Sequence, residues 1–405
     1  MLRLVLTGVF LVGAIGCGGG ELVVKTSTHD PKKKEAKQLV VDARDQVTAG
    51  HIDDADRTYG EAYATASESP KLAYEILAEW VDFLDHAGRY PRAVEIAKQY
   101  NGANLMDPNG YDLYAGALLL ANRAKDALDI ASQLIQLNGN LASGHEKRGR
   151  ALIAMGQPDE GVDELRKAVQ LEPDSAKYHM ALGEQLHEMG DANKAALELR
   201  AALKAAPQDS QAHALLGAAL RDQDETDEAK QHLDKAIELD HRNGQAYFEL
   251  GVLYNRQAAA LGDRGQQKQA EAEAAFGKAV KYSPNESRYW YAYGEIYRVQ
   301  QHVDDALVAY RKAVKLEPPY PKAFAKLGGM LLEKKQYEEA EVYLTKAVRT
   351  DEKNPISYWY LGRLYSATHK PRAALENLEL FLRYAPKDDP NREKAHELVN
   401  QLKRR

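Results

Sequence analysis

The sequence predicts an all-α protein, a solenoid of about ten helical hairpins with a capping helix at the C-terminus. Three observations support this fold class. A glycine recurs about every 34 residues, a second small residue keeps step with it, and most units end in proline. Each hairpin is expected to bury an apolar stripe against the next, so the 405 residues need no single central core.

The segment from Ser287 to Pro318 is the clearest copy of the unit. Its first helix has an apolar stripe with a gap at one glycine: Trp290, Tyr293, Gly294 and Tyr297. Its second helix repeats the spacing with Ala306, Tyr310 and Ala313. The small residues allow the two backbones to approach closely. Pro318 then stops the second helix because it has no amide hydrogen to donate.

The glycine of this unit recurs through most of the chain, at Gly149, Gly183, Gly217, Gly251, Gly294, Gly328 and Gly362. The intervals are 34 residues, except for one of 43. The paired small residue follows in step, at Gly161, Ala195, Ala229, Ala272, Ala306, Ala340 and Ala374. A fixed period of this length is typical of helical repeats.

These residues resemble the tetratricopeptide repeat (TPR) pattern W-x2-L-G-x2-Y, A-x3-F and P, with Tyr293 in place of Leu and Tyr310 in place of Phe. The resemblance implies a right-handed superhelix over residues 36–388, with a concave groove lined by the first helix of each hairpin. Weaker copies are expected at about 74–107 and 108–141, after a degenerate first repeat. An insertion in repeat seven, near 256–267, is expected to lengthen both helices around a turn. Whether it has a function stays open.

The first 16 residues resemble a bacterial lipoprotein signal peptide. The apolar run from Leu4 to Ile15 is too short to span a bilayer as a helix, and it leads into Ala14-Ile15-Gly16-Cys17, which resembles a lipobox. Cys17 is the only cysteine, so no internal disulfide can form. The resemblance implies that Cys17 carries a lipid. Gly18 after it favours the outer membrane, facing the periplasm; the alternatives are the plasma membrane or secretion to the periplasm.

Two further segments flank the repeats. Residues 17–35 are expected to form a flexible tether, with the first helix starting near Glu35. Residues 389–405 are expected to form the capping helix, with Asp389 as N-cap and Pro390 as its first residue. Its apolar face combines Ala395, Leu398, Val399 and Leu402.

The family's groove positions predict a partner-binding surface in repeats seven to ten. Transferred to this chain, they give Phe248, Asn255, Arg288, Tyr291, Glu295, Arg298, Lys322, Trp359 and Arg363. Aromatic residues and Arg are enriched at interface hot spots, and this set suits an extended peptide with apolar and acidic side chains. The alternative is that Phe248, Tyr291 and Trp359 pack inside the solenoid.

A second candidate surface lies in repeat two. Four carboxylates fall on one face of its first helix: Glu75, Glu79, Asp82 and Asp85. They predict either a basic partner or a solvated helix face. The net charge of −6 gives no reason to expect nucleic acid.

Three histidines, His145, His179 and His213, also follow the 34-residue period. Stacked helices lie roughly 8–10 Å apart, which is too far for the nitrogens to share a zinc ion, so packed histidines are expected. No motif of a metalloprotease, a serine hydrolase or a phosphate-binding loop is found. No enzymatic activity, metal or cofactor is therefore expected.

Together these features predict a lipid-anchored interaction scaffold of the bacterial cell envelope. Its partners would be envelope proteins or peptide segments held in the groove, as parts of a secretion, pilus, gliding motility or outer-membrane assembly machine. The alternative function is that of a periplasmic chaperone for unfolded outer-membrane proteins.

Overall fold

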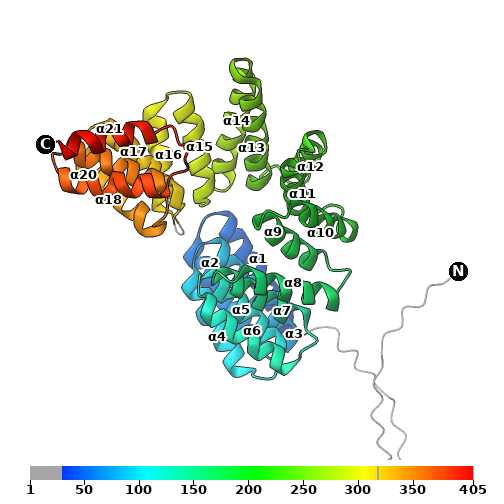
Figure 1. Ribbon diagram of the computed structural model, residues 1–405. Helices are drawn as coiled ribbons and strands as arrows, with labels where there is room; N and C mark the ends of the chain where they lie inside the picture. Colours follow the sequence, from blue (N-terminus) through cyan, green and yellow to red (C-terminus); the bar gives the residue numbers. More distant parts are fainter. Residues whose placement is uncertain (1–29, 317–318, 405) are drawn as a thin grey trace, which may run out of the picture. The chain divides into compact units, whose positions relative to one another are not determined.

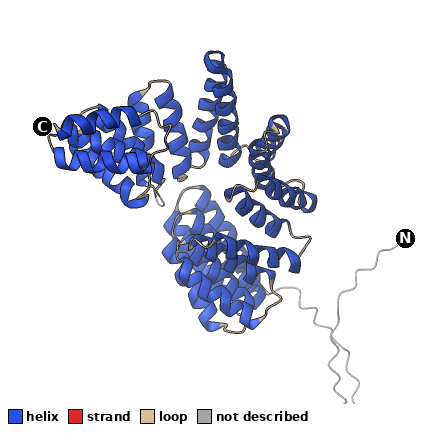
Figure 2. Ribbon diagram, viewed as in Figure 1, coloured by secondary structure: helices blue, strands red, loops and turns tan. Residues whose placement is uncertain are grey.

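The structure is a computed structural model that describes residues 30–316 and 319–404. Within these ranges it contains twenty-one α-helices, one short 3-10 helix and no strand (Figures 1 and 2). The predicted all-α class is confirmed. No helix in these ranges is both long and apolar enough to cross a membrane. The signal peptide, Cys17 and Pro318 lie outside the described residues.

The chain divides into two compact units at Ala121 and Asn122. The first contains α1 (Pro31–Thr48), α2 (Ile52–Thr65), α3 (Pro70–His86), α4 (Tyr90–Ala103) and α5 (Pro108–Leu120). Helices α1 and α2 pack as one hairpin, and α3 and α4 as the next. The boundary divides the predicted third repeat, because its first helix belongs to this unit and its second helix to the other.

The second unit begins with α6 (Ala124–Leu137) and continues as seven hairpins. The first three hairpins are α7 (Ala142–Ala154) with α8 (Pro158–Leu171), α9 (Ala176–Glu188) with α10 (Ala192–Ala205), and α11 (Ser210–Asp222) with α12 (Thr226–Leu239). The fourth is α13 (Gly244–Leu261) with α14 (Gln266–Tyr282), joined by the 3-10 helix Gly262–Gly265. The last three are α15 (Ser287–Val299) with α16 (Val303–Lys315), α17 (Pro321–Glu333) with α18 (Tyr337–Thr350), and α19 (Pro355–Ala367) with α20 (Pro371–Tyr384).

The repeat-seven insertion lengthens both helices, as predicted. Helix α13 has 18 residues and α14 has 17, whereas α11 has 13 and α12 has 14.

The repeating glycine holds the two helices of each hairpin together. A Cβ atom at Gly217 would lie 2.6 Å from Cγ of Leu233 and 3.1 Å from the carbonyl oxygen of Ala229. At Gly183 and Gly328 the same atom would meet Leu199 and Leu344 at 2.7 and 2.5 Å. The second helix therefore occupies the space that any side chain larger than glycine would need.

The first helix starts earlier than the sequence analysis expected. Helix α1 begins at Pro31 and not near Glu35, because the side chain of Asp30 accepts hydrogen bonds from the backbone amides of Lys32 and Lys33. Proline suits the first helical position because its missing amide hydrogen is not needed there. The three lysines after Pro31 therefore belong to the helix.

The capping helix α21 (Arg392–Lys403) starts two residues later than expected. Asp389 does not cap it; its Oδ1 accepts hydrogen bonds from the backbone amide and the side-chain amide of Asn391. Arg392 then donates to the carbonyl oxygens of Leu382 and Ala385, at the end of α20. The predicted apolar face is correct: Ala395 and Val399 are buried, and Leu398 and Leu402 pack against the same cluster.

We predict that Gly217→Ala destabilises the protein by up to about 2 kcal/mol in urea unfolding. Overpacking costs roughly 1–3 kcal/mol, offset by about 1 kcal/mol of better helix propensity. Gly102→Ala is the matched control, because Gly102 is exposed in α4 with nothing within 4 Å of the added carbon. A Gly217→Ala protein as stable as the control would contradict the close approach.

Candidate functional site

The first helices of repeats five to eight carry a cavity of about 260 Å³. Helix α11 contacts both α9 and α13, so these helices form one surface. The cavity is lined by Glu184, His187, Glu188, Leu215, Gln245, Glu249, Glu286, Arg288 and Tyr289. We call it the α9–α15 cavity.

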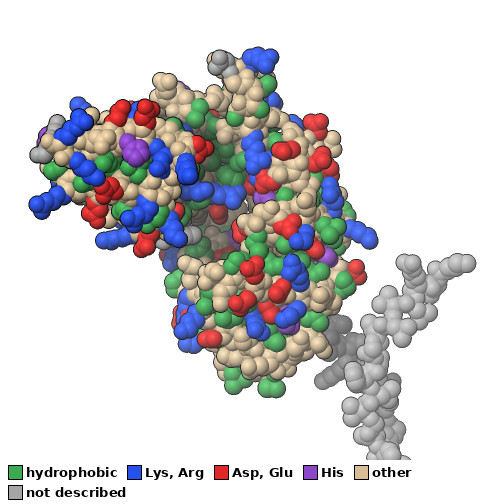
Figure 3. Space-filling view, viewed as in Figure 1, with side chains coloured by type: hydrophobic (Ala, Val, Ile, Leu, Met, Phe, Trp, Pro, Cys, Tyr) green, Lys and Arg blue, Asp and Glu red, His purple; other side chains and the backbone are tan. Residues whose placement is uncertain are grey.

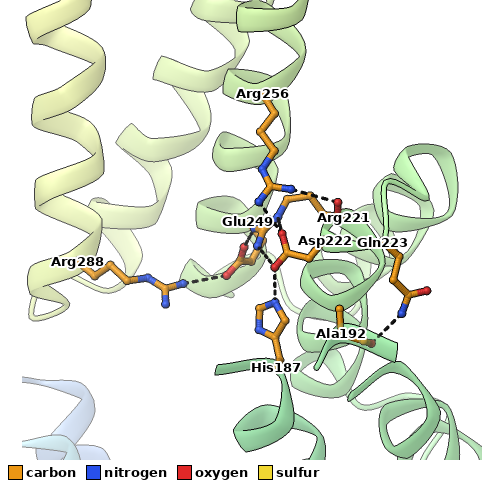
Figure 4. A network of polar contacts seen from close by, with 8 residues as sticks. All are labelled: His187, Ala192, Arg221, Asp222, Gln223, Glu249, Arg256 and Arg288. Atoms are coloured by element: carbon orange, nitrogen blue, oxygen red, sulfur yellow. Dashed lines mark hydrogen bonds and ion pairs between the residues drawn. The ribbon is translucent and has the colours of Figure 1, made fainter. Parts of the chain in front are cut away.

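A network of charged side chains joins the four helices beside this cavity (Figure 4). Arg221 of α11 pairs with Glu249 of α13, and Arg288 of α15 donates to the other oxygen of Glu249 at 3.0 Å. Glu249 is 1% exposed and Arg221 is 7% exposed, so this link is buried. Helices α11, α13 and α15 are thus each held to the next by an ion pair.

A second chain of contacts centres on Asp222, at the end of α11. Its Oδ2 lies 2.7 Å from Nε2 of His187, and its Oδ1 lies 2.6 Å from Nη2 of Arg256. Burial alone would raise the pKa of Asp222, but the hydrogen bond from His187 and the ion pairs with Arg221 and Arg256 outweigh it. The pKa of Asp222 is therefore held well below its usual range, and the carboxylate stays charged.

Of the predicted groove residues, Arg288 lines the cavity and Phe248 lies beneath it. Phe248 is 4% exposed and stacks on Tyr289 with 4.4 Å between the ring centres. The guanidinium carbon of Arg288 lies 4.4 Å from the centre of the Phe248 ring. Phe248 therefore supports the wall of the site and is not itself open to a partner.

The expected row of exposed aromatic residues is not present. Trp359 is 5% exposed and packs on Phe381 of its own hairpin, with ring centres 5.4 Å apart. Tyr291 is half-buried against Tyr310 and Tyr320. The alternative, that these rings pack inside the solenoid, is the correct one, because contacts within and between hairpins remove their apolar area from water.

The remaining predicted groove residues differ in whether their side chains already have hydrogen-bond or ion-pair partners. Glu295 is held by Arg298, by the hydroxyl of Tyr310 and by Lys326 at 3.3 Å. Burial opposes ionisation of Glu295, but these partners lower its pKa overall. Arg363 pairs with Glu333 at 2.8 Å. Asn255 and Lys322 are exposed.

The predicted acidic face of α3 is partly neutralised. Glu79 accepts two hydrogen bonds of 2.7 Å from Arg44 of α1 and one of 2.8 Å from the hydroxyl of Tyr59. Glu75 and Asp82 are exposed, and Asp85 is half-buried with its pKa raised by burial. Glu79 is therefore already paired, and a basic partner for the other three carboxylates stays a prediction.

The three periodic histidines have a structural task, and no metal-binding group is found among the described residues. Each imidazole Nε2 lies 2.9–3.2 Å from the carbonyl oxygen six residues earlier. Trp290 and Tyr358 occupy the same repeat position and donate to the equivalent carbonyl, that of Pro284 and that of Glu352. An aromatic donor at this position satisfies a loop carbonyl that helix geometry leaves free.

Sequence reasoning missed the central members of the network, which are Arg221, Asp222, Glu249 and Arg256, and also Glu184, which lines the cavity. A signal for Glu249 was present, because the equivalent positions of the two preceding repeats hold Ala181 and Leu215. A carboxylate where neighbouring repeats bury apolar side chains indicates a buried charge that needs a partner.

Comparison with known proteins identifies the repeats. Residues 152–219 and 210–243 match the tetratricopeptide repeat, and residues 267–379 match the middle TPR-like domain of cilia and flagella-associated protein 70. These matches support tetratricopeptide repeats in residues 152–243 and a TPR-like domain in residues 267–379. Comparison with curated proteins gives no match.

Two solved structures share the fold along nearly the whole chain. One is the human IFIT1 dimer with m7Gppp-AAAA, at 16% identity and a TM-score of 0.60, covering 94% of this chain and 96% of that chain. The other is the Cut9-Hcn1 hetero-tetramer of APC/C, at 14% identity and a TM-score of 0.56, covering 93% and 78%. At these identities the likeness concerns the fold alone.

We predict that Glu249→Ala lowers the free energy of unfolding by about 3 kcal/mol, because it leaves the buried Arg221 without one of its two carboxylates. Arg256→Ala is the control. Arg256 is half exposed, so its loss should cost less than about 1 kcal/mol. Urea unfolding of both variants measures the difference; equal costs would show that burial does not set the strength of the network.

We predict that His232→Glu stabilises the protein by about 1 kcal/mol at pH 6. Glu164 and Glu198 contact the histidines of repeats four and five at the position that His232 occupies in repeat six. Burial and the nearby His213 lower the pKa of His232, so its imidazole binds a proton less readily in the folded protein than in the unfolded chain. Stability is then lost as the pH falls below about 6.5.

The advantage of His232→Glu should therefore grow between pH 7.5 and pH 5.5, as measured by urea unfolding at both values. His232→Gln, which cannot titrate, separates the loss of the proton site from the gain of a carboxylate. An advantage that is the same at both pH values would contradict this account.

Proposed function

We propose that this protein is a non-enzymatic interaction scaffold that binds a segment of a partner protein along the first helices of repeats five to eight. TPR folds bind peptides or proteins in a groove, and the α9–α15 cavity opens on the helices that form that groove. The observation that carries the proposal is the buried ion-pair network beside the cavity. It holds four helices in a fixed arrangement, which is what a preorganised binding surface requires.

The surface chemistry supports a protein partner. On the face seen in Figure 3, positive and negative side chains are interspersed over the helices of the second unit. Nucleic-acid binding depends instead on clustered Lys and Arg.

We further propose that Cys17 carries a lipid that fixes the scaffold to the bacterial envelope, at the outer membrane. The support is the sequence pattern from Arg3 to Cys17. In this setting the scaffold would help assemble or stabilise an envelope machine. A chaperone for unfolded outer-membrane proteins is disfavoured, because Phe248 and Trp359 are buried and provide no broad apolar surface.

Photo-crosslinking in cells tests the interaction. We expect a photoreactive residue at Arg298 or Lys322 to capture one or two dominant proteins, because both positions are exposed on first helices. Leu197, 67% exposed on the second helix α10, is the control position. A broad range of outer-membrane proteins would favour the chaperone, and adducts equal to those of Leu197 would contradict a groove.

Membrane fractionation tests the anchor. Cys17→Ala removes the only thiol, and we expect it to move the protein from the membrane fraction to the soluble fraction. A Cys17→Ala protein that stays with the membrane would overturn lipidation at this residue and leave the interaction proposal in place.

A further inference from the structure

We propose that the α9–α15 cavity accepts a positively charged side chain, Lys or Arg, from an extended partner segment. The proposal deepens the proposed function, because it states the chemistry of the segment that the groove would hold. It also reverses the sequence-based expectation of an acidic partner.

The arginines of the site are already occupied. Arg288 is committed to Glu249, Arg221 to Glu249 and Asp222, and Arg256 to Asp222. An incoming carboxylate would compete for Arg288 with Glu249, which is 1% exposed and would then keep only Arg221 as its partner. Removing one partner of a buried charge is unfavourable. Arg288, Arg298 and Arg363, the arginines that suggested an acidic partner, are each already paired with a carboxylate: Glu249, Glu295 and Glu333.

The unoccupied charges of the cavity are negative. In residues 30–316 and 319–404, no hydrogen bond or ion pair involves the side chains of Glu184, Glu188 or Glu286. Glu184 is half-buried, and burial raises its pKa overall; Arg150 and His187 oppose this rise, whereas Glu188, one turn away, adds to it. A cation placed between these carboxylates would relieve that repulsion.

The other walls suit a long cationic side chain. Leu215 and Tyr289 line the same cavity. Aliphatic stems of Lys and Arg pack on such apolar surfaces, and a cation near a tyrosine ring gains a further attraction. The volume of about 260 Å³ is far above the roughly 10–15 Å³ needed for one water molecule.

A second cavity indicates an extended segment and not a single small cation. It has a volume of about 440 Å³ and shares Gln245, Glu286 and Tyr289 with the first. It continues past Asp209 and Asp240, each of which accepts a backbone hydrogen bond at the start of a helix or turn. The two cavities together follow the stack from α9 to α15, as a peptide would.

The test is a fluorescence-anisotropy titration of the full chain with a short labelled peptide in which Arg alternates with Gly and Ser. Two matched peptides carry citrulline or Glu in place of Arg. We expect the Arg peptide to bind more tightly than both others. The double variant Glu184→Gln with Glu286→Gln should weaken its binding at least about fivefold.

Glu160→Gln is the control for the overall charge of the protein, because Glu160 is exposed on α8 and does not line either cavity. Circular dichroism checks that all variants remain folded. Equal weakening by the control would show that the peptide responds only to net charge, and would overturn the proposal. So would tighter binding of the Glu or citrulline peptide, or no binding of the Arg peptide.

These outcomes are separable from those of the proposed function. A single protein captured from Arg298 or Lys322, combined with no effect of Glu184→Gln and Glu286→Gln on the Arg peptide, would retain the scaffold and discard the cationic segment.

Discussion

The close approach of two helix backbones at one glycine is the constraint on which the rest of the structure depends. At Gly149 an added Cβ would lie 2.8 Å from the carbonyl oxygen of Gly161, and at Gly217 it would lie 2.6 Å from Leu233. The side chain that faces the glycine is fully buried in hairpin after hairpin, as at Leu199, Leu233 and Leu344. Each hairpin thereby becomes a rigid block, and stacking such blocks creates one continuous apolar interior.

Hairpin stacking does not require every position of the first helices to be apolar, and in this protein several of these positions hold charged residues. Glu249 is buried where the two preceding repeats place the apolar side chains Ala181 and Leu215, and it pairs with the buried Arg221. A buried ion pair is a poor source of stability compared with apolar packing. The network to which this pair belongs joins α9, α11, α13 and α15. Its contacts define the surface of these helices more strictly than apolar packing alone would. This is the physical link between the fold and the proposed binding site.

One repeat position shows how different residues perform the same task. His145, His179, His213, Trp290 and Tyr358 all lie within hydrogen-bonding distance of the carbonyl six residues earlier. In these five repeats the position holds a ring with a polar group at its far end, whereas in repeat nine it holds Phe324, which has none. Helices α12 and α18 end at the same position of the repeat as α10 and α14, although His241 and Glu352 stand in place of the proline. After each of these two helices an aspartate side chain accepts a backbone hydrogen bond within the following turn, Asp240 from Arg242 and Asp351 from Lys353, so local chemistry supports the turn without proline.

The sequence by itself determined the helical class, the repeat frame, the longer hairpin of repeat seven and the apolar face of the cap. All of these follow from periodicity, which is a local property of the chain. Only the tertiary structure decided which groove residues are available. Whether Phe248 faces a partner or Tyr289, and whether Arg288 is free or bound to Glu249, depends on the neighbouring hairpin about 40 residues away. Spacing within one repeat carries no information about that contact, so the charge of the site could be established only once the helices were placed side by side.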